Sequence, residues 1–340
     1  MRKGILTILI LILTVTLVFS GDELSKVGTT MAQFLKVGVS GRGTALGDAY
    51  VAGVNDPTAM AWNPAGMQQI GKRAFALSHT QLFADITLNY AGLVIPVTPH
   101  QSLGISVIYL NSGNIDLTTI EEPEGTGETF TATDAAIGVS YSRRLTERFV
   151  LGLTVKYIQE KLYHEKASTF AFDIGSQFDT GIYGMRLGMA LQNFGGKMKL
   201  DGPDLDMPLT DPETGYENKS GARMQTLEWP IPLLFKMGIM MDLVGKNSEI
   251  MKSAKNRFSI ALEANDPIDH YLRFNFGAEY EWNGMFALRA GYKLNYDEAS
   301  FTAGAGFKVN MGGTLLQLDY SFNDYGLLDY VHQYSFAFTF

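Results

Sequence analysis

The chain of 340 residues contains no cysteine, which excludes disulfides, thiolate metal sites and a lipid-modified N-terminal cysteine. It also lacks an excess of basic residues, because 27 Lys and Arg stand against 35 Asp and Glu, for a formal net charge of −8. A protein that binds nucleic acid needs a basic face for the phosphates. We therefore expect no nucleic-acid partner.

Long apolar runs are scarce as well. The uncharged run at residues 5–19 is shorter than the ~20 residues that a membrane-spanning helix needs. It follows two basic residues and precedes Ser20-Gly21, which is the pattern of a signal peptide. We expect residues 1–20 to be a signal peptide cleaved near Ser20-Gly21; a retained anchor is the alternative.

Sequence motifs for catalysis or metal binding are missing. The five histidines are scattered and form no HExxH motif. We expect no enzymatic activity, no cofactor and no metal site. The alternative is Ca²⁺ bound by Asp201, Asp204 and Asp206, but these residues lack the EF-hand spacing and its bidentate Glu. A solvated acidic loop is our preferred interpretation.

What the chain does have, near its start, is a stretch of small residues with helix signals. The segment GTALGDAYVAG (43–53) has apolar residues at helical spacing and predicts a helix of about three turns. Asp56-Pro57 predicts the start of a second short helix that runs to Trp62 and ends at Asn63-Pro64. Such helices are too short to form their own core, so we expect residues 21–71 to be a plug that fills the interior of a larger structure formed by the rest of the chain.

The rest of the chain alternates apolar and polar residues with the period of two that is typical of β-strands. Most of these segments have the ~10–12 residues that cross a bilayer when the strand is tilted. Together with 36 glycines and many aromatics, the pattern predicts an all-β membrane protein, with residues 72–340 forming a transmembrane β-barrel. The fourteen expected strands are 72–79, 86–97, 101–111, 129–143, 147–161, 167–178, 181–194, 229–244, 256–265, 271–282, 285–294, 300–310, 313–323 and 330–340.

The last strand carries a row of aromatic residues on one face, and it ends the chain with phenylalanine: Tyr334, Phe336, Phe338 and Phe340. Such a patch would aggregate in a soluble protein. A terminal strand of this kind looks like the C-terminal signal of bacterial outer-membrane barrels. We therefore expect the bacterial outer membrane as the location and its lipid as a partner.

Connections between the expected strands alternate between short and long, with the long loops expected outside the cell. Two long loops, 112–128 and 195–228, are rich in acidic residues, and neither has predicted secondary structure. The loop 245–256 is long for the opposite end, and we expect a small helix there. Charged residues at inward positions of the strands predict ion pairs with each other or with the plug; a polar path for a solute is the alternative. These residues are Lys156, Arg186, Glu263, Arg289, Lys293, Lys308 and Asp319.

The pattern FL..G...RG.ALGDAYVA...DP.A..WNPAG in residues 34–66 resembles the start of PorV/PorQ-type proteins of the FadL-like outer-membrane barrel superfamily. The resemblance implies fourteen strands around an N-terminal hatch. It also implies a constriction or gate at the hatch motif, which is Asn63, Pro64, Ala65 and Gly66. The ligand-lining residues that it implies are Phe34, Leu35, Tyr50, Met60, Trp62 and Met67.

Two functions fit this resemblance. The first, which we favour at this point because the hatch motif is present, is passive passage or binding of hydrophobic small molecules past the hatch. The alternative is a component of type IX secretion, which binds secretion-machinery or cargo proteins through the loops 112–128 and 195–228. A structural barrel without transport is the third interpretation.

Overall fold

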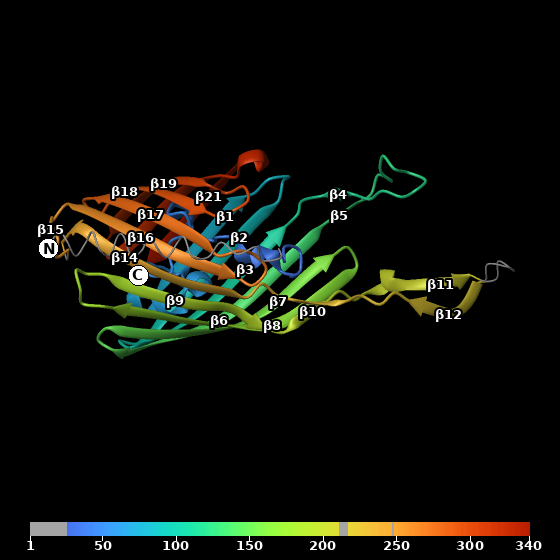
Figure 1. Cartoon of the computed structure of the whole chain (residues 1–340), viewed down its shortest axis with the longest axis horizontal. Helices are drawn as coiled ribbons and strands as arrows, with labels where there is room; N and C mark the ends of the chain where they lie inside the picture. The colour runs from blue at the N-terminus through green and yellow to red at the C-terminus, as the bar shows by residue number, and fades with distance from the viewer. Residues whose placement is uncertain (1–25, 211–216, 247) are drawn as a thin grey trace.

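The computed structural model describes residues 26–210, 217–246 and 248–340, so the expected signal peptide at 1–20 lies outside the described residues. Fourteen strands form a closed antiparallel barrel (Figure 1), and each lies where the sequence predicts one. They are β1 (Ala74–Gln81), β2 (Thr87–Thr98), β3 (Gln101–Asn111), β6 (Ala132–Thr146), β7 (Phe149–Leu162), β8 (Glu165–Asp179), β9 (Arg186–Gly195), β14 (Leu234–Gly245), β16 (Asn256–Pro267), β17 (Arg273–Trp282), β18 (Phe286–Leu294), β19 (Phe301–Met311), β20 (Thr314–Asp324) and β21 (Tyr330–Thr339).

The barrel closes because its first and last strands pair, with Phe75 opposite Phe338. Closure satisfies the backbone groups that an open sheet edge would expose to lipid. Along β7, Leu151, Leu153 and Val155 are exposed on the outer face, whereas the residues between them face inward and are buried. The alternation predicted from the sequence therefore separates an apolar outer face from a polar inner one. No helix among the described residues is long and apolar enough to cross a membrane.

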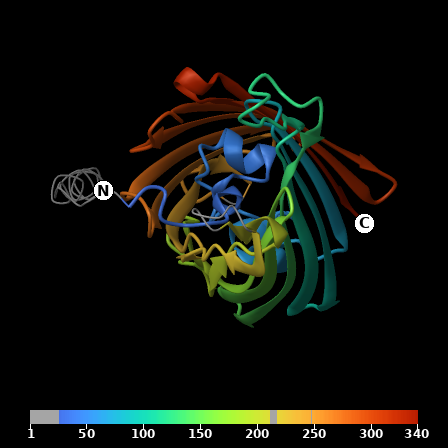
Figure 2. The same ribbon diagram turned by 90° about the vertical axis from the view of Figure 1, so that its right-hand side faces the viewer.

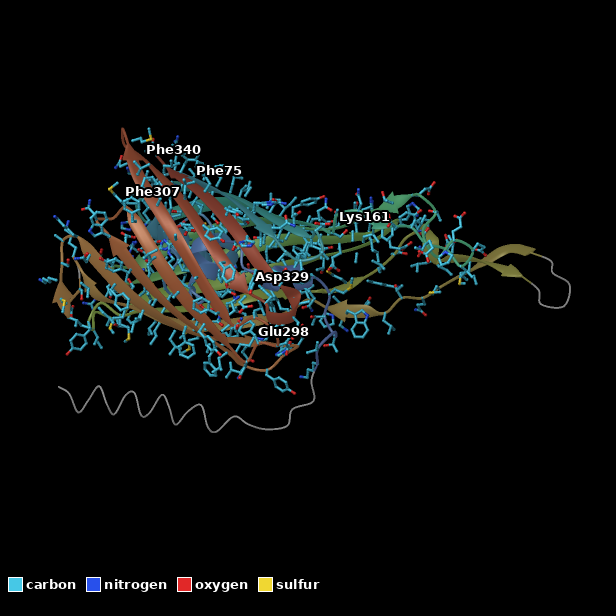
Figure 3. The ribbon with its side chains drawn as sticks, turned by 90° about the horizontal axis from the view of Figure 1, so that it is seen from above. Phe75, Lys161, Glu298, Phe307, Asp329 and Phe340 are labelled. Carbon is cyan, nitrogen blue, oxygen red and sulfur yellow. The ribbon has the colours of Figure 1, made fainter. Side chains whose placement is uncertain are left out.

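The two ends of the barrel differ. Phe307 and Phe340 lie toward the end with short turns, here called the short-turn end, and Lys161 lies toward the other, here called the long-loop end (Figure 3). Two hairpins project from the long-loop end (Figure 1). The first is β4 (Ile115–Asp116) with β5 (Thr129–Phe130), and the second is β11 (Asp206–Thr210) with β12 (Glu217–Arg223).

The loop 195–228 therefore has regular structure that the sequence did not predict. Besides β11 and β12 it contains β10 (Lys197–Lys199), which pairs with β13 (Glu228–Pro230), and the 3-10 helix η3 (Pro203–Leu205). The small helix expected at 245–256 is wrong. In the described residues 248–256, Met251–Lys252 forms β15, which pairs in parallel with β14, and the Ser248 hydroxyl donates a hydrogen bond to the Leu243 carbonyl.

Residues 31–70, here called the N-terminal segment, lie inside the barrel (Figure 2). The segment contains η1 (Gln33–Lys36), α2 (Gly41–Ala45), α3 (Ala59–Trp62) and η2 (Pro64–Gln69). The three-turn helix expected at 43–53 is wrong, because the helix α2 ends at Ala45 and both Gly47 and Asp48 adopt positive φ. The second helix and its end are confirmed, since Asn63 is extended at φ −160° directly after Trp62. Its expected start at Asp56-Pro57 is wrong, because α3 begins at Ala59 with Thr58 as its N-cap.

Candidate functional site in the barrel lumen

The N-terminal segment enters the barrel at the long-loop end, where backbone and side chains both hold it. The Met31 N–H donates to the Pro230 carbonyl at 2.9 Å. Asp269, in the loop between β16 and β17, accepts hydrogen bonds from Thr30 at 2.6 Å, Gln33 at 3.0 Å and Lys36 at 2.9 Å. Burial alone would raise the pKa of Asp269, but these hydrogen bonds and the Lys36 charge outweigh it and lower the pKa to about 2.

We expect Asp269→Asn to loosen η1, because the neutral amide loses the charge-assisted bonds to Lys36. A pKa lowered from 3.8 to about 2 is a stabilisation that is present above about pH 4 and is lost as the pH falls through about 2. Allowing for partial solvent screening, it corresponds to about 1–2 kcal/mol. Hydrogen exchange of residues 31–37 at pH 7 measures the loosening, with α3 as the internal reference. Equal exchange in both proteins would contradict this role for Asp269.

Deeper in the barrel, a buried ion network joins the N-terminal segment to the wall. Arg42 donates two hydrogen bonds of 2.9 Å to the carboxylate of Glu279 on β17. Arg289 donates to the same carboxylate at 2.7 Å and to Asp319, also at 2.7 Å, and Arg257 reaches Glu279 at 3.1 Å. Glu279 is fully buried and so are the side chains of Arg42 and Arg289. The charges compensate one another, which is what makes their burial tolerable.

Further inward-facing charges are paired in the same way. Lys293 forms an ion pair with Asp48 at 2.5 Å, and the Glu263 carboxylate accepts the backbone N–H groups of Tyr50 and Val51 at 2.9 and 2.8 Å. Two more predicted lumen residues pair with the wall itself, Lys156 with Asp173 at 2.8 Å and Lys308 with Glu281 at 2.8 Å. Most of the inward charges predicted from the sequence thus neutralise one another or hold the N-terminal segment.

The hatch motif packs against the wall of β7 and β8. The Asn63 side chain donates hydrogen bonds of 2.9 Å to the carbonyls of Val51 and Ser176, and its oxygen accepts from the Ala65 N–H. Two strand glycines make room for the motif. A Cβ at Gly152 would overlap the backbone of Pro64 and Ala65, and one at Gly175 would overlap the Asn63 side chain. The motif therefore lies in a notch that only glycine permits.

A cavity of about 40 Å³ lies on the long-loop side of the motif. Of the residues implied as ligand-lining, Leu35, Met60 and Trp62 line it. Phe34, Tyr50 and Met67 do not; they are buried in the apolar core that the N-terminal segment forms with the inner wall. Tyr50 packs edge-on against Trp62 and donates a hydrogen bond to Asp56.

A second cavity, of about 60 Å³, lies near the short-turn end and is lined by Gln69, Gln177, Arg148 and Arg186 among others. The hatch residues Asn63, Pro64, Ala65 and Gly66 line neither cavity. In the sequence they lie between Trp62, which lines the first cavity, and Gln69, which lines the second. The Gln177 side chain donates to the Val54 carbonyl at 3.0 Å and so binds the N-terminal segment beside the motif.

The first cavity is more polar than the sequence-based prediction of an apolar ligand pocket implied. Its wall carries cations that sequence reasoning did not select, namely Lys36, Lys236 and Arg273, in addition to Lys156. Lys236 lies over the Trp62 ring at 4.9 Å, and Arg273 lies over the Tyr296 ring at 4.4 Å. In the sequence, Lys236 and Arg273 lie within the expected strands 229–244 and 271–282, and Lys36 lies in the expected plug, without a motif that marks any of them. Among the described residues, no three metal-ligating side chains come together.

Comparison with known families matches residues 20–208, more than half of the chain, to the family described as type IX secretion system protein PorV. A comparison with curated protein sequences finds no match. Among solved structures, the chain is similar to the Ralstonia pickettii toluene transporter TbuX and to the CymD monoaromatic hydrocarbon channel. In each case the TM-score is 0.57 at 12% identity, over 89% of this chain and 98% of the other. The Pseudomonas putida toluene transporter TodX has a TM-score of 0.53 at 10% identity, over 86% of this chain and 96% of its own. At these identities the likeness establishes the barrel fold.

Proposed function

This chain belongs to the PorV family of type IX secretion system proteins, and from that premise we propose that it is an outer-membrane barrel that docks a partner protein at its long-loop end. The observation that carries the proposal is the pair of hairpins that project from the long-loop end (Figure 1), on a barrel whose lumen holds the N-terminal segment (Figure 2). The N-terminal segment is held by buried ion pairs and hydrogen bonds from several strands. Binding through the loops requires none of these contacts to break.

The hairpin β11–β12 and its flanks expose apolar side chains that the membrane does not cover. Exposed apolar residues on the barrel wall face lipid, but those beyond the rim meet water, where large apolar side chains favour a partner. Met207, Met224, Leu227 and Trp229 are between 40% and 69% exposed. The ribbon of β11 and β12 has no other strand paired with it in the described residues, so its edges are available for strand addition.

We expect the triple substitution Met207→Ser, Met224→Ser and Leu227→Ser to abolish partner binding and leave the barrel folded, because these exposed side chains lie outside the fourteen strands that close the barrel. Native mass spectrometry of the barrel extracted from its own outer membrane measures this. Ile250→Ser with Met251→Ser is the matched control, since both residues are exposed apolar side chains at the short-turn end. A stoichiometric protein partner should accompany the wild type and the control and be absent from the triple variant.

The second candidate is passage of a small molecule past the hatch, and the two cavities on either side of Asn63–Gly66 favour it. Against it stand the small cavity, well below the ~300–1,000 Å³ of drug-sized ligand pockets, and a lining in which charged residues interrupt the apolar ones. In the same mass spectra, a bound small apolar mass that is lost on Trp62→Ala, without a protein partner, would replace docking with passage as the function.

A further inference from the structure

Three polar side chains form a row across neighbouring strands of the barrel wall. Lys236 on β14 pairs directly with Asn265 on β16, and Asn265 pairs directly with Arg273 on β17. Directly opposed residues of antiparallel strands point to the same face of a sheet. All three side chains line the first cavity, so the wall presents two cations and an amide at one level of the lumen.

The two cations of this row differ from the other cations of the cavity because neither has a carboxylate within ion-pair distance among the described residues. Lys36 and Lys156 are neutralised by Asp269 and Asp173. Lys236 and Arg273 form no ion pair with any described residue, and each instead lies over an aromatic ring. Lys236 is only 7% exposed. The Glu263 carboxylate acts on Lys236 electrostatically without direct contact, while it accepts the backbone N–H groups of Tyr50 and Val51. A buried cation without a counter-ion in direct contact is still costly, which makes an anion in contact with it favourable.

Residues of the same lining carry hydrogen-bond donors without partners, and a partnerless acceptor, Oδ1 of the Asp48 carboxylate that pairs with Lys293. Trp62 is 3% exposed and its Nε1–H has no partner among the described residues, and neither does Arg273 Nε–H. The amide of Asn265 also has a partnerless oxygen, so rotation of the amide can turn its NH₂ group to the cavity instead. Buried donors of this kind are normally satisfied.

We propose that Lys236, Asn265 and Arg273, with the Trp62 indole N–H, form a binding site for one small oxyanion, the carboxylate of a small organic acid. Two cations and a neutral N–H donor match the acceptor oxygens of a single carboxylate with charge-assisted hydrogen bonds. A cavity of about 40 Å³ admits a group of that size. Leu35, Val37 and Ile108 in the same lining provide an apolar wall for a short carbon chain. The site stands apart from the docking of a partner at the hairpins.

The test uses the full chain with Trp229→Phe and Trp282→Phe, which leaves Trp62 as its single tryptophan. Iodide is the probe, because it is an anion that quenches indole fluorescence on contact. Caesium, a cationic quencher, and acrylamide, a neutral one, measure how accessible the Trp62 indole is to quenchers of other charge. We expect iodide to quench Trp62 saturably and more strongly than caesium, and sodium acetate to reverse the quenching at constant ionic strength.

Lys236→Gln with Arg273→Gln should weaken the apparent iodide and acetate affinities by about ten-fold or more, since two charged donors are lost. The same variant should unfold no more readily than its parent without anion, because it removes charges that lack partners. Lys308→Gln is the matched control: it removes a lumen cation near the short-turn end that pairs with Glu281, and should leave quenching unchanged. Quenching that is equal for iodide and caesium, that acetate does not reverse, or that persists in the double variant would overturn the site.

Discussion

Glu279→Gln is expected to lower the free energy of unfolding by about 3–5 kcal/mol, the usual cost of removing one partner from a buried ion network. The carboxylate accepts hydrogen bonds from Arg42, Arg257 and Arg289. In the variant, Arg289 keeps Asp319 and Arg257 keeps the partly exposed Asp242, whereas Arg42 keeps only the neutral amide of Asn55. The effect should be large because Glu279 is fully buried, so that water cannot replace the lost charge.

Urea unfolding of the barrel refolded in lipid measures this change. Glu281→Gln is the matched control, because Glu281 lies two residues along the same strand and pairs with Lys308 where both side chains are partly exposed. Its substitution should cost less than about 1 kcal/mol. If the two variants were equally stable, the network at Glu279 would not be what anchors the N-terminal segment.

Gly175→Val is expected to force the hatch motif off the barrel wall. A Cβ at this position would overlap the Asn63 side chain and come within 2.7 Å of Pro64 Cδ, and no strained φ complicates the substitution. Overpacking of this kind costs about 3 kcal/mol when the neighbour cannot move. Asn63 would lose its hydrogen bond to the Ser176 carbonyl as well, so the barrel should remain closed while the segment loosens.

Protease cleavage within residues 50–70 of the folded barrel reports that loosening, and wild-type protein should resist it. Gly245→Ala is the control, because the nearest atom to its added Cβ is a flexible Arg257 carbon at 3.6 Å. It should remain resistant. Wild-type resistance in Gly175→Val would show that the notch does not hold the motif.

The strands were predictable from the sequence because the alternation that defines them is local. Leu151, Leu153 and Val155 all face lipid, and this does not depend on which strands lie beside them. The alternation of apolar and polar residues can therefore be read from the sequence of one strand alone. The first helix was not predictable in this way. The spacing of Ala45, Leu46 and Ala49 favours a helix, but the positive φ of Gly47 and Asp48 and the ion pair from Asp48 to Lys293 override it.

The candidate site was only partly predictable, for a related reason. The family pattern pointed to Trp62 and Met60, which line the cavity, and also to Phe34 and Met67, which are packed in the core. Which inward charges lack a partner depends on strand register. Lys156 forms an ion pair with Asp173 on the next strand, whereas Lys236 is opposite Asn265 on its neighbouring strand. Nothing in the sequence around either lysine distinguishes the two.

Single-channel conductance of the wild-type barrel in a planar bilayer tests the central claim most directly, namely that the N-terminal segment closes the lumen and that function lies at the long-loop end. We predict that the wild type carries no steady current of the size expected for an open barrel, because Arg42, Asn63 and Lys293 tie the segment to strands around the wall. A large, steady conductance in the wild type would contradict the account and favour passage through the lumen.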